Sequence, residues 1–467
     1  AIAPDGRSWA TAFSTIQDGL DAAVARGVRT IWVAAGNYNE DRSPSGALNL
    51  TGDVTLLGGF LGTELEAQQR DPSANVTIID GSSAAGGSPA PNVVLARGST
   101  SIEGFTIRGG EGTIGAGLLA EAPSSLSLND CIFEANNAST TGGAIQANGP
   151  ALTASNVVFR NNAANAGGGI AISDSTFTAS GLLFEGNNAS TGAGIFASDD
   201  STLSLLESVM RSNDATQSGG AIALLDSQAN VSGVLFEENR AAISGGAVFA
   251  NALASLDVAN SLFFDNRAEQ SGGAIGAVND TSGKQAPTVA IDNSLFAGNQ
   301  SFDTGGALFA DNYAFALQHC TLFGNEGANG GSALVAIGGA SNITNSIVFG
   351  HVGPAFSTAN AGTVSLAFSL FDTPVAGPGN LNANPLFLDA ANRDFRLQAG
   401  SPAVDRGTTS MLTQDLQGEP RPQGNAPDMG AYESPFSAQM PEGEGTIEGA
   451  PEGEGAAEGE GLAEGEG

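Results

Sequence analysis

A repeat of about 26 residues runs through the middle of the chain and limits the folds open to it. The tetrapeptide Gly-Gly-Ala-aliphatic begins at Gly142, Gly219, Gly245, Gly272 and Gly305. Related copies with one substitution or insertion begin at Gly167, Gly192 and Gly330. Self-similarity at a fixed period of this length indicates a solenoid, in which each unit buries its apolar face against its neighbours.

A second motif, Phe-x-x-Asn, keeps the same period. Met replaces Phe in one copy, and Phe323 continues the apolar position without a matching Asn. The expected apolar column is Phe133, Phe159, Phe184, Met210, Phe236, Phe263, Phe296 and Phe323. The expected amide column is Asn136, Asn162, Asn187, Asn213, Asn239, Asn266 and Asn299.

The repeat unit predicts strands and no long helix. Short alternating segments such as 156–159 are broken by Gly, Asn and Ser, which is typical of strands joined by tight turns. A propeller blade needs about 40–45 residues, so a unit of this length is too short for one. We therefore expect an all-β chain, a right-handed parallel β-helix of roughly 14–15 coils with an N-terminal helical cap and an irregular C-terminal cap.

The two motifs have physical roles in such a coil. Coils stack about 4.8 Å apart, so equivalent Phe side chains form a column in the core. Asn tolerates a left-handed corner, and its amide can bond the coils above and below. Gly-Gly suits the other corner, where a Cβ would be excluded.

The ends of the chain differ from the repeat. Residues 1–30 contain a capping-box pattern and a short amphipathic helix, which predict an N-terminal cap. Residues 31–396 predict the β-helix, 397–435 a closing segment, and 436–467 a Glu/Gly-rich tail or linker. A longer step in the repeat predicts a surface loop at 279–287, which holds Lys284, the single lysine of the chain.

Charge and hydropathy exclude several classes of function. The chain has 16 basic and 49 acidic side chains, a net charge of −33, so phosphate contact is disfavoured and we expect no nucleic-acid partner. No apolar run reaches the length of a transmembrane helix. The first residues are compatible with a mature N-terminus after signal cleavage. We expect an extracellular or cell-surface protein.

The sequence predicts no catalytic, cofactor-binding or metal-binding residues. Acidic candidates in neighbouring coils form no compact pattern of two or three carboxylates: Asp199, Asp200, Asp226, Asp257 and Asp265. His319 and His351 lack an acidic partner motif and are expected to be solvated. Calcium stays a weak alternative because the chain is acidic, although no known calcium loop is present.

Three further features have structural interpretations. Asp405, Arg421 and Asp428 are expected to form a hydrogen-bonded staple, with an active cluster as the alternative. Cys131 and Cys320 lie seven coils apart, so we expect free buried thiols. Weak glycosylation candidates in Asn-x-Ser/Thr are Asn49, Asn75, Asn137, Asn188, Asn230, Asn279, Asn299 and Asn342.

The paired motifs over residues 142–334 resemble the repeats of chlamydial polymorphic membrane proteins, which are surface β-helices and adhesins. The opening segment 5–38 and the closing segment 394–433 resemble bacterial surface β-helix proteins of the pectate-lyase-like superfamily. The resemblance implies the fold and a surface location. The membrane barrel that ends the chlamydial proteins has no counterpart here, so autotransport is not implied.

We therefore expect a non-catalytic structural or adhesive β-helix. Partners left open are a second copy of the chain, through head-to-tail or tail-mediated filaments, and cell-surface glycans or matrix. The alternative is a polysaccharide lyase or glycoside hydrolase of the β-helix superfamily.

Overall fold

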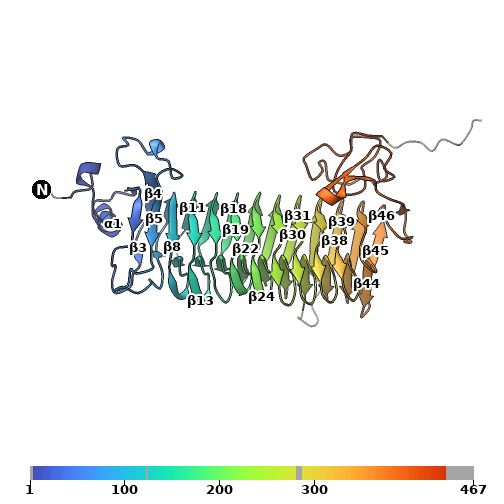
Figure 1. Cartoon of the computed structure of the whole chain (residues 1–467), viewed down its shortest axis with the longest axis horizontal. Coiled ribbons are helices and arrows are strands. Elements are labelled where there is room, and N and C mark those ends of the chain that lie inside the picture. Colours follow the sequence, from blue (N-terminus) through green and yellow to red (C-terminus); the bar gives the residue numbers. More distant parts are fainter. Residues whose placement is uncertain (1–3, 122–124, 280–286, 438–467) are drawn as a thin grey trace, which may run out of the picture.

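The computed structural model describes residues 4–121, 125–279 and 287–437. These residues form a parallel β-helix, an elongated stack of coils with three long sheets of 13, 12 and 14 strands (Figure 1). The stack has about thirteen coils, slightly fewer than the 14–15 expected. At about 4.8 Å per coil, its length is about 60 Å.

One central coil shows how the chain travels round the helix. Strand β21 (Ile195–Ser198) is followed by β22 (Thr202–Leu206), β23 (Val209–Arg211) and β24 (Asp214–Ser218). These strands belong to four different sheets, which we name sheets C, A, B and E. The next coil repeats the order, so each strand pairs with its equivalents one coil before and one coil after.

Sheet A begins with β1 (Thr30–Ala34) and ends with β45 (Thr363–Ala367). Its central strands after β22 are β26 (Gln228–Ser232), β30 (Ser255–Ala259), β34 (Thr288–Asp292) and β38 (Ala314–Gln318).

Sheet C begins with β3 (Leu48–Leu50) and ends with β44 (Phe356–Ala359). Its central strands after β21 are β25 (Ile222–Leu225), β29 (Val248–Asn251), β33 (Ile275–Val278), β37 (Leu308–Asp311) and β41 (Leu334–Ile337).

Sheet B begins with β2 (Gly36–Tyr38) and ends with β47 (Leu381–Asn382). Its central strands after β23 are β27 (Leu235–Glu237), β31 (Leu262–Phe264), β35 (Leu295–Ala297), β39 (Thr321–Phe323) and β43 (Ile347–Phe349). The short sheet E contains β20 (Asn188–Thr191), β24, β28 (Arg240–Ala241), β32 (Arg267–Ala268), β36 (Gln300–Ser301) and β40 (Glu326–Gly327).

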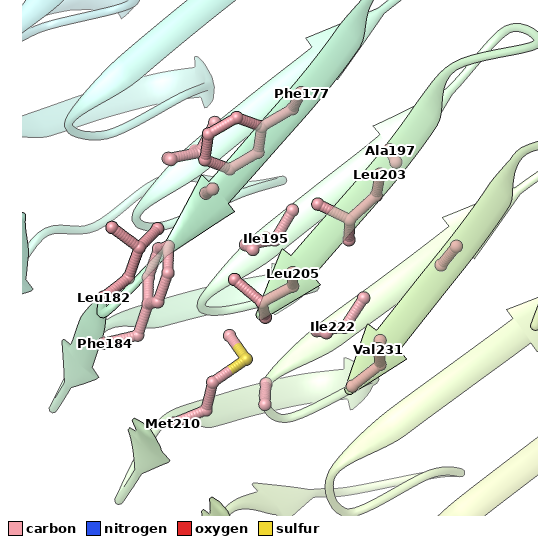
Figure 2. Packing of buried hydrophobic residues seen from close by; sticks show 14 of the residues in the cluster. Phe177, Leu182, Phe184, Ile195, Ala197, Leu203, Leu205, Met210, Ile222 and Val231 are labelled. Atoms are coloured by element: carbon pink, nitrogen blue, oxygen red, sulfur yellow. The ribbon is translucent and has the colours of Figure 1, made fainter. Parts of the chain in front are cut away.

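The core runs along the axis of the helix, inside the three long sheets. In β22, Leu203 and Leu205 point inward while Thr202 and Ser204 point outward, because side chains alternate along a strand. Figure 2 shows Leu203 and Leu205 meeting residues of the other sheets, such as Ile195 and Met210. Each coil thus buries its apolar set against the coils on either side.

The N-terminal end of the core is covered by helix α1 (Ile16–Ala25). The Thr15 side chain accepts a hydrogen bond from the backbone N–H of Asp18, which stabilises the first turn. Ile16 and Leu20 are buried in the same cluster as the first coils, so the helix protects that end from solvent.

The C-terminal segment lies along the flank of the helix (Figure 1). After β47 the chain forms the antiparallel pair β48 (Phe387–Asp389) and β49 (Asp394–Leu397), then runs without long strands. We name residues 383–437 the clasp. Its contacts reach back to β27, β31, β35 and β39, so this irregular closing segment packs against the flank of the coils that contain these strands.

Two sequence-predicted segments fall largely or wholly outside the described residues. These are most of the loop expected at 279–287, with Lys284, and the Glu/Gly-rich segment from residue 438 onward. In the ranges that the structure describes, no helix is both long and apolar enough to cross a membrane.

Candidate functional site

The Asn column is a continuous buried ladder at the corner that follows sheet B. In a typical rung, the Asn239 side chain donates to the carbonyl of Met210 (2.8 Å) and to Asn266 Oδ1 (2.9 Å). Asn239 Oδ1 accepts from both the backbone N–H (3.1 Å) and the side chain (2.9 Å) of Asn213. The members are Asn136, Asn162, Asn187, Asn213, Asn239, Asn266, Asn299 and Asn325, all buried.

The aromatic column lies in the core beside this ladder. The rings of Phe133 and Phe159 stack with centroids 5.4 Å apart, and those of Phe159 and Phe184 are 4.6 Å apart. After Met210 the stacking resumes, with centroid distances of 4.6 Å and 4.5 Å along Phe236, Phe263 and Phe296. The column and the amide ladder fix the register of successive coils.

The sequence assigned the next aromatic position to Phe323, and this was wrong by one residue. Leu322 pairs with Phe296 and is buried, whereas Phe323 pairs with Ala297 and faces outward. The signal was present in the sequence, because Leu322 precedes Asn325 by three residues, as Phe does elsewhere. Phe323 instead packs against Phe387 and Phe395 of the clasp.

His351 occupies the position after Asn325 at the end of the ladder. Its Nδ1 accepts a hydrogen bond from the backbone N–H of Asn325 (3.1 Å). Burial lowers the pKa of His351 to about 4. The expectation of a solvated histidine was therefore wrong: a neutral ring replaces an amide at this corner.

The Gly-Gly corner requires glycine for two distinct reasons. Gly245 has a φ of +66°, a conformation that side chains disfavour. A Cβ on Gly246 would lie 2.1 Å from the carbonyl oxygen of Gly273 in the next coil. The two glycines of this corner therefore allow successive coils to stack closely.

The clasp holds a buried cluster of charged groups. Arg421 forms an ion pair with Glu433 (3.1 Å), and both side chains have no exposed surface. Arg421 also donates to the carbonyl of Asp428 (3.0 Å), whose carboxylate accepts from the backbone N–H of Asp405 (2.8 Å). Burial, more than the neighbouring Asp428, raises the pKa of Glu433 to about 7.

His319 joins this cluster to the β-helix. It is fully buried, so its predicted solvation was wrong. Its Nδ1 lies 2.6 Å from Arg421, and Nε2 lies 2.9 Å from the Asn345 amide. Burial, with the charge of Arg421, lowers the pKa of His319 to about 3. The groups expected as a staple thus fasten the clasp to the corner between sheets A and B.

The acidic candidates from the sequence do not meet at one place. Asp199, Asp200 and Asp226 lie at the corner between sheets C and A, Asp257 points outward from sheet A, and Asp265 lies at the corner after sheet B. Across the described ranges, no three His, Cys, Asp or Glu side chains form a group that could hold a metal ion.

A polar cleft lies on the flank beside the Asn ladder. Its volume is about 390 Å³, and it is lined by residues 212–214, Glu238, Arg240, Asp265 and Arg267. These residues come from three consecutive coils, at the corners that lead into β24, β28 and β32. Arg240 and Arg267 are 27 positions apart in the sequence, and only the stacking of the coils brings them into one cleft.

A column of half-buried aromatic side chains lies on the outer face of sheet C. Phe196, Phe249 and Phe309 occupy the same outward register in alternate coils. The coils between them carry Ala223 and Gly276 at that position. The rings therefore recur about every 9.6 Å along the rod. The Phe-x-x-Asn motif marks only phenylalanines of the inward column, so it gives no signal for this outer one.

The remaining sequence candidates can be placed directly. Cys131 and Cys320 are free and buried, as expected, and burial raises their thiol pKa values to about 11 and about 12. Among the sequons, Asn299 is a buried ladder member and Asn279 is buried. These two side chains are inaccessible to glycosylation in the folded chain. Exposed sequon residues are Asn137, Asn188, Asn230 and Asn342, with Asn49 and Asn75 half-buried.

Residues 233–251 match the Chlamydia polymorphic membrane protein repeat. That segment holds the Phe-x-x-Asn and Gly-Gly-Ala motifs of one coil. Among solved structures, the chain is similar to one described as the crystal structure of pectate lyase Pel9A, with 12% identity and a TM-score of 0.38. The similarity covers 93% of this chain and 94% of that one.

No curated protein matches the chain. A TM-score this low does not carry the activity of the lyase over to this protein. The molecule is a parallel β-helix protein that contains a repeat of the polymorphic-membrane-protein type.

Proposed function

We propose that this protein is a non-catalytic β-helix of the cell surface or extracellular space, a rod that binds glycans or matrix in an adhesive or structural role. The aromatic column of sheet C carries the proposal. Phe196, Phe249 and Phe309 repeat at every second coil and are partly accessible. Regular aromatic contacts along a rigid rod suit an extended, repeating ligand.

The surroundings of the column favour an uncharged ligand. The neighbouring outward register carries Leu225, Asn251 and Val278 before it reaches Asp311. On a chain with a net charge of −33, the strands β25, β29 and β33 themselves carry no charged side chain. Because aromatic faces present apolar area with little loss of side-chain freedom, they are effective binding contacts.

The experiment measures binding of the full chain to immobilised neutral polysaccharides and matrix proteins by interferometry. A triple variant, F196S/F249S/F309S, is expected to bind at least tenfold more weakly, because each ring supplies buried contact area. The matched control is T153S/T178S/S204T on the outer face of sheet A. Equal binding by wild type and the triple variant, or no binding by wild type, overturns the proposal.

Self-association is a second candidate, favoured by the C-terminal end of the rod. Phe356, Val364 and Leu366 of the last coils are only partly buried against the core. Helix α1 covers the opposite end. A head-to-tail filament needs two complementary open ends, whereas one open end favours a closed symmetric pair. We therefore favour an end-to-end dimer over the head-to-tail filament that the sequence left open.

The alternative enzyme, a polysaccharide lyase or hydrolase, is tested in the same samples. Lyases leave unsaturated sugar ends and hydrolases leave new reducing ends. Formation of either product from a bound polysaccharide, at a rate proportional to the protein concentration, contradicts a purely binding role.

A further inference from the structure

The polar cleft contains two arginines in an unusual setting for this chain. Arg240 and Arg267 are paired residues of the adjacent parallel strands β28 and β32. Like charges on adjacent strands, about 4.8 Å apart, destabilise a sheet. Ten of the fifteen arginines have ion pairs among the described residues, and these two are among the five that have none there. An anion between them would remove the repulsion.

The Arg267 side chain is held in place and keeps an unused hydrogen-bond donor. Its guanidinium carbon lies 3.8 Å from the centroid of the Phe302 ring, which fixes the plane of the group. Its Nε is buried and has no hydrogen-bond partner in the described structure. A buried donor of this kind costs free energy until an acceptor binds. Arg240, one coil away, is exposed on the same cleft.

The acidic residues of the cleft limit which anion fits. Asp265 is paired with Arg393 of the clasp, which leaves Asp214 and Glu238 to face the two arginines. A multiply charged phosphate or sulfate would be repelled by those carboxylates. A ligand that carries a carboxylate and neighbouring hydroxyl groups suits both the arginines and the acidic side chains of the cleft. Guanidinium groups bind a carboxylate by paired hydrogen bonds, and Asp and Glu accept hydrogen bonds from hydroxyl groups.

The dimensions point to one sugar residue. The cleft spans three coils, about 9.6 Å between the outer strands, and its volume of about 390 Å³ is that of a small-ligand site. Arg393, which bridges Glu237 and Asp265, lies beside it. We propose that this cleft binds a terminal carboxylated sugar residue of a glycoconjugate, with its carboxylate between Arg240 and Arg267.

The test uses the full chain and isothermal titration with the methyl glycoside of N-acetylneuraminic acid. Its methyl ester, which lacks the negative charge, and inorganic phosphate are the comparison probes. The acid is expected to bind, and the ester at least tenfold more weakly, since a hydrogen bond to a charged group is worth about 1.5–3 kcal/mol. Equal binding of acid and ester, equal binding of phosphate, or no binding of the acid overturns the proposal.

Variants locate the site. Arg240→Gln and Arg267→Gln are each expected to weaken binding of the acid at least tenfold. Arg160→Gln is the matched control, because Arg160 is a half-exposed arginine on the neighbouring sheet B and is paired with Glu134. Unfolding midpoints of all variants verify that they fold. Unchanged affinity in both cleft variants contradicts the site, while the neutral-glycan test of the aromatic column is unaffected.

Discussion

At the scale of single residues, the buried amides do most to specify the coil. Each ladder Asn before the last one, Asn325, accepts from the backbone of the coil before it, donates to a carbonyl there, and bonds the amide of the coil after it, as Asn239 does. A parallel sheet alone would allow a coil to shift along its neighbour. The ladder forbids the shift, because it would leave buried donors and acceptors without partners.

Replacing one ladder amide should therefore destabilise the whole rod. In Asn239→Ala, the backbone N–H of Asn213 and the carbonyl of Met210 lose partners in the interior. At about 1–3 kcal/mol for each unsatisfied group, we expect a loss of roughly 2–6 kcal/mol in the free energy of unfolding, measured in urea. Asn230→Ala, at an exposed position on sheet A, is the control and should change stability by less than about 0.5 kcal/mol.

His319 should give the fold a dependence on acid. Its pKa is lowered to about 3 in the folded chain, from 6.5. As the pH falls below about 6.5, the unfolded chain therefore binds this proton first, and stability decreases. His319→Gln should have a shallower loss between pH 6.5 and 4, with the difference reaching roughly 3 kcal/mol. His351 titrates in both chains, and equal slopes would contradict the assignment.

Glu433 acts in the opposite sense. Its folded pKa of about 7 lies above the ordinary value of 4.5, so its stabilising contribution is present at low pH and is lost as the pH rises toward 7. The two groups compensate within one cluster. A wild-type pH profile alone would hide both, which is why the comparison with His319→Gln is needed.

At the scale of elements, the repeat predicted the coils well and the clasp poorly. A period of about 26 residues dictates strand order, because every coil meets only its neighbours. The clasp has no period, and its placement rests on contacts between residues more than 100 positions apart, such as Asn293 with Gln414. No local pattern in the sequence specifies such a contact.

The errors in the candidate site have the same origin. Phe323 matched the residue type of the column, but Leu322 matched the spacing to Asn325, and spacing determines which side of a strand faces inward. Arg240 and Arg267 are 27 residues apart in sequence and adjacent in space. The sequence therefore gives no sign of the cleft, because the cleft forms only when β28 pairs with β32 in this register.

The clasp should detach when its main apolar contact is removed. Phe395 is buried with Phe264, Leu295 and Ala297 of sheet B. Loss of a buried Phe costs about 3–5 kcal/mol, so Phe395→Ala should raise hydrogen exchange across residues 401–434 and leave the central coils unchanged. The control, Leu388→Ala, alters a side chain that is 47% exposed. Uniform exchange increases across the rod would show that clasp and coils unfold together.

At the scale of the whole molecule, the rod has two unlike ends and unlike faces. Helix α1 closes one end, the clasp lies on one flank, and sheet C presents the aromatic column on its outer face. The buried and the outward-facing residues therefore have different roles. The interior fixes the shape, while the outer registers are free to vary without disturbing the stack.

The partly buried apolar residues of the last coils lead to a prediction about assembly. If the last coil mediates pairing, Leu366→Glu should convert dimers to monomers, because it places a charge in an apolar contact. Leu206→Glu, at a 42% exposed position on the middle of sheet A, is the matched control and should leave the mass unchanged. Light scattering measures the mass, and dimers of the Leu366→Glu chain would exclude this end as the interface.

We expect the rod to bind an extended ligand and to leave it intact. In the test, the full chain is incubated with each polysaccharide that it binds. The recovered carbohydrate is then analysed by mass spectrometry. We expect the protein to retain the polysaccharide and the chain-length distribution to stay unchanged after prolonged incubation. Shortened chains with unsaturated or new reducing ends, formed in proportion to protein, would contradict it and identify an enzyme.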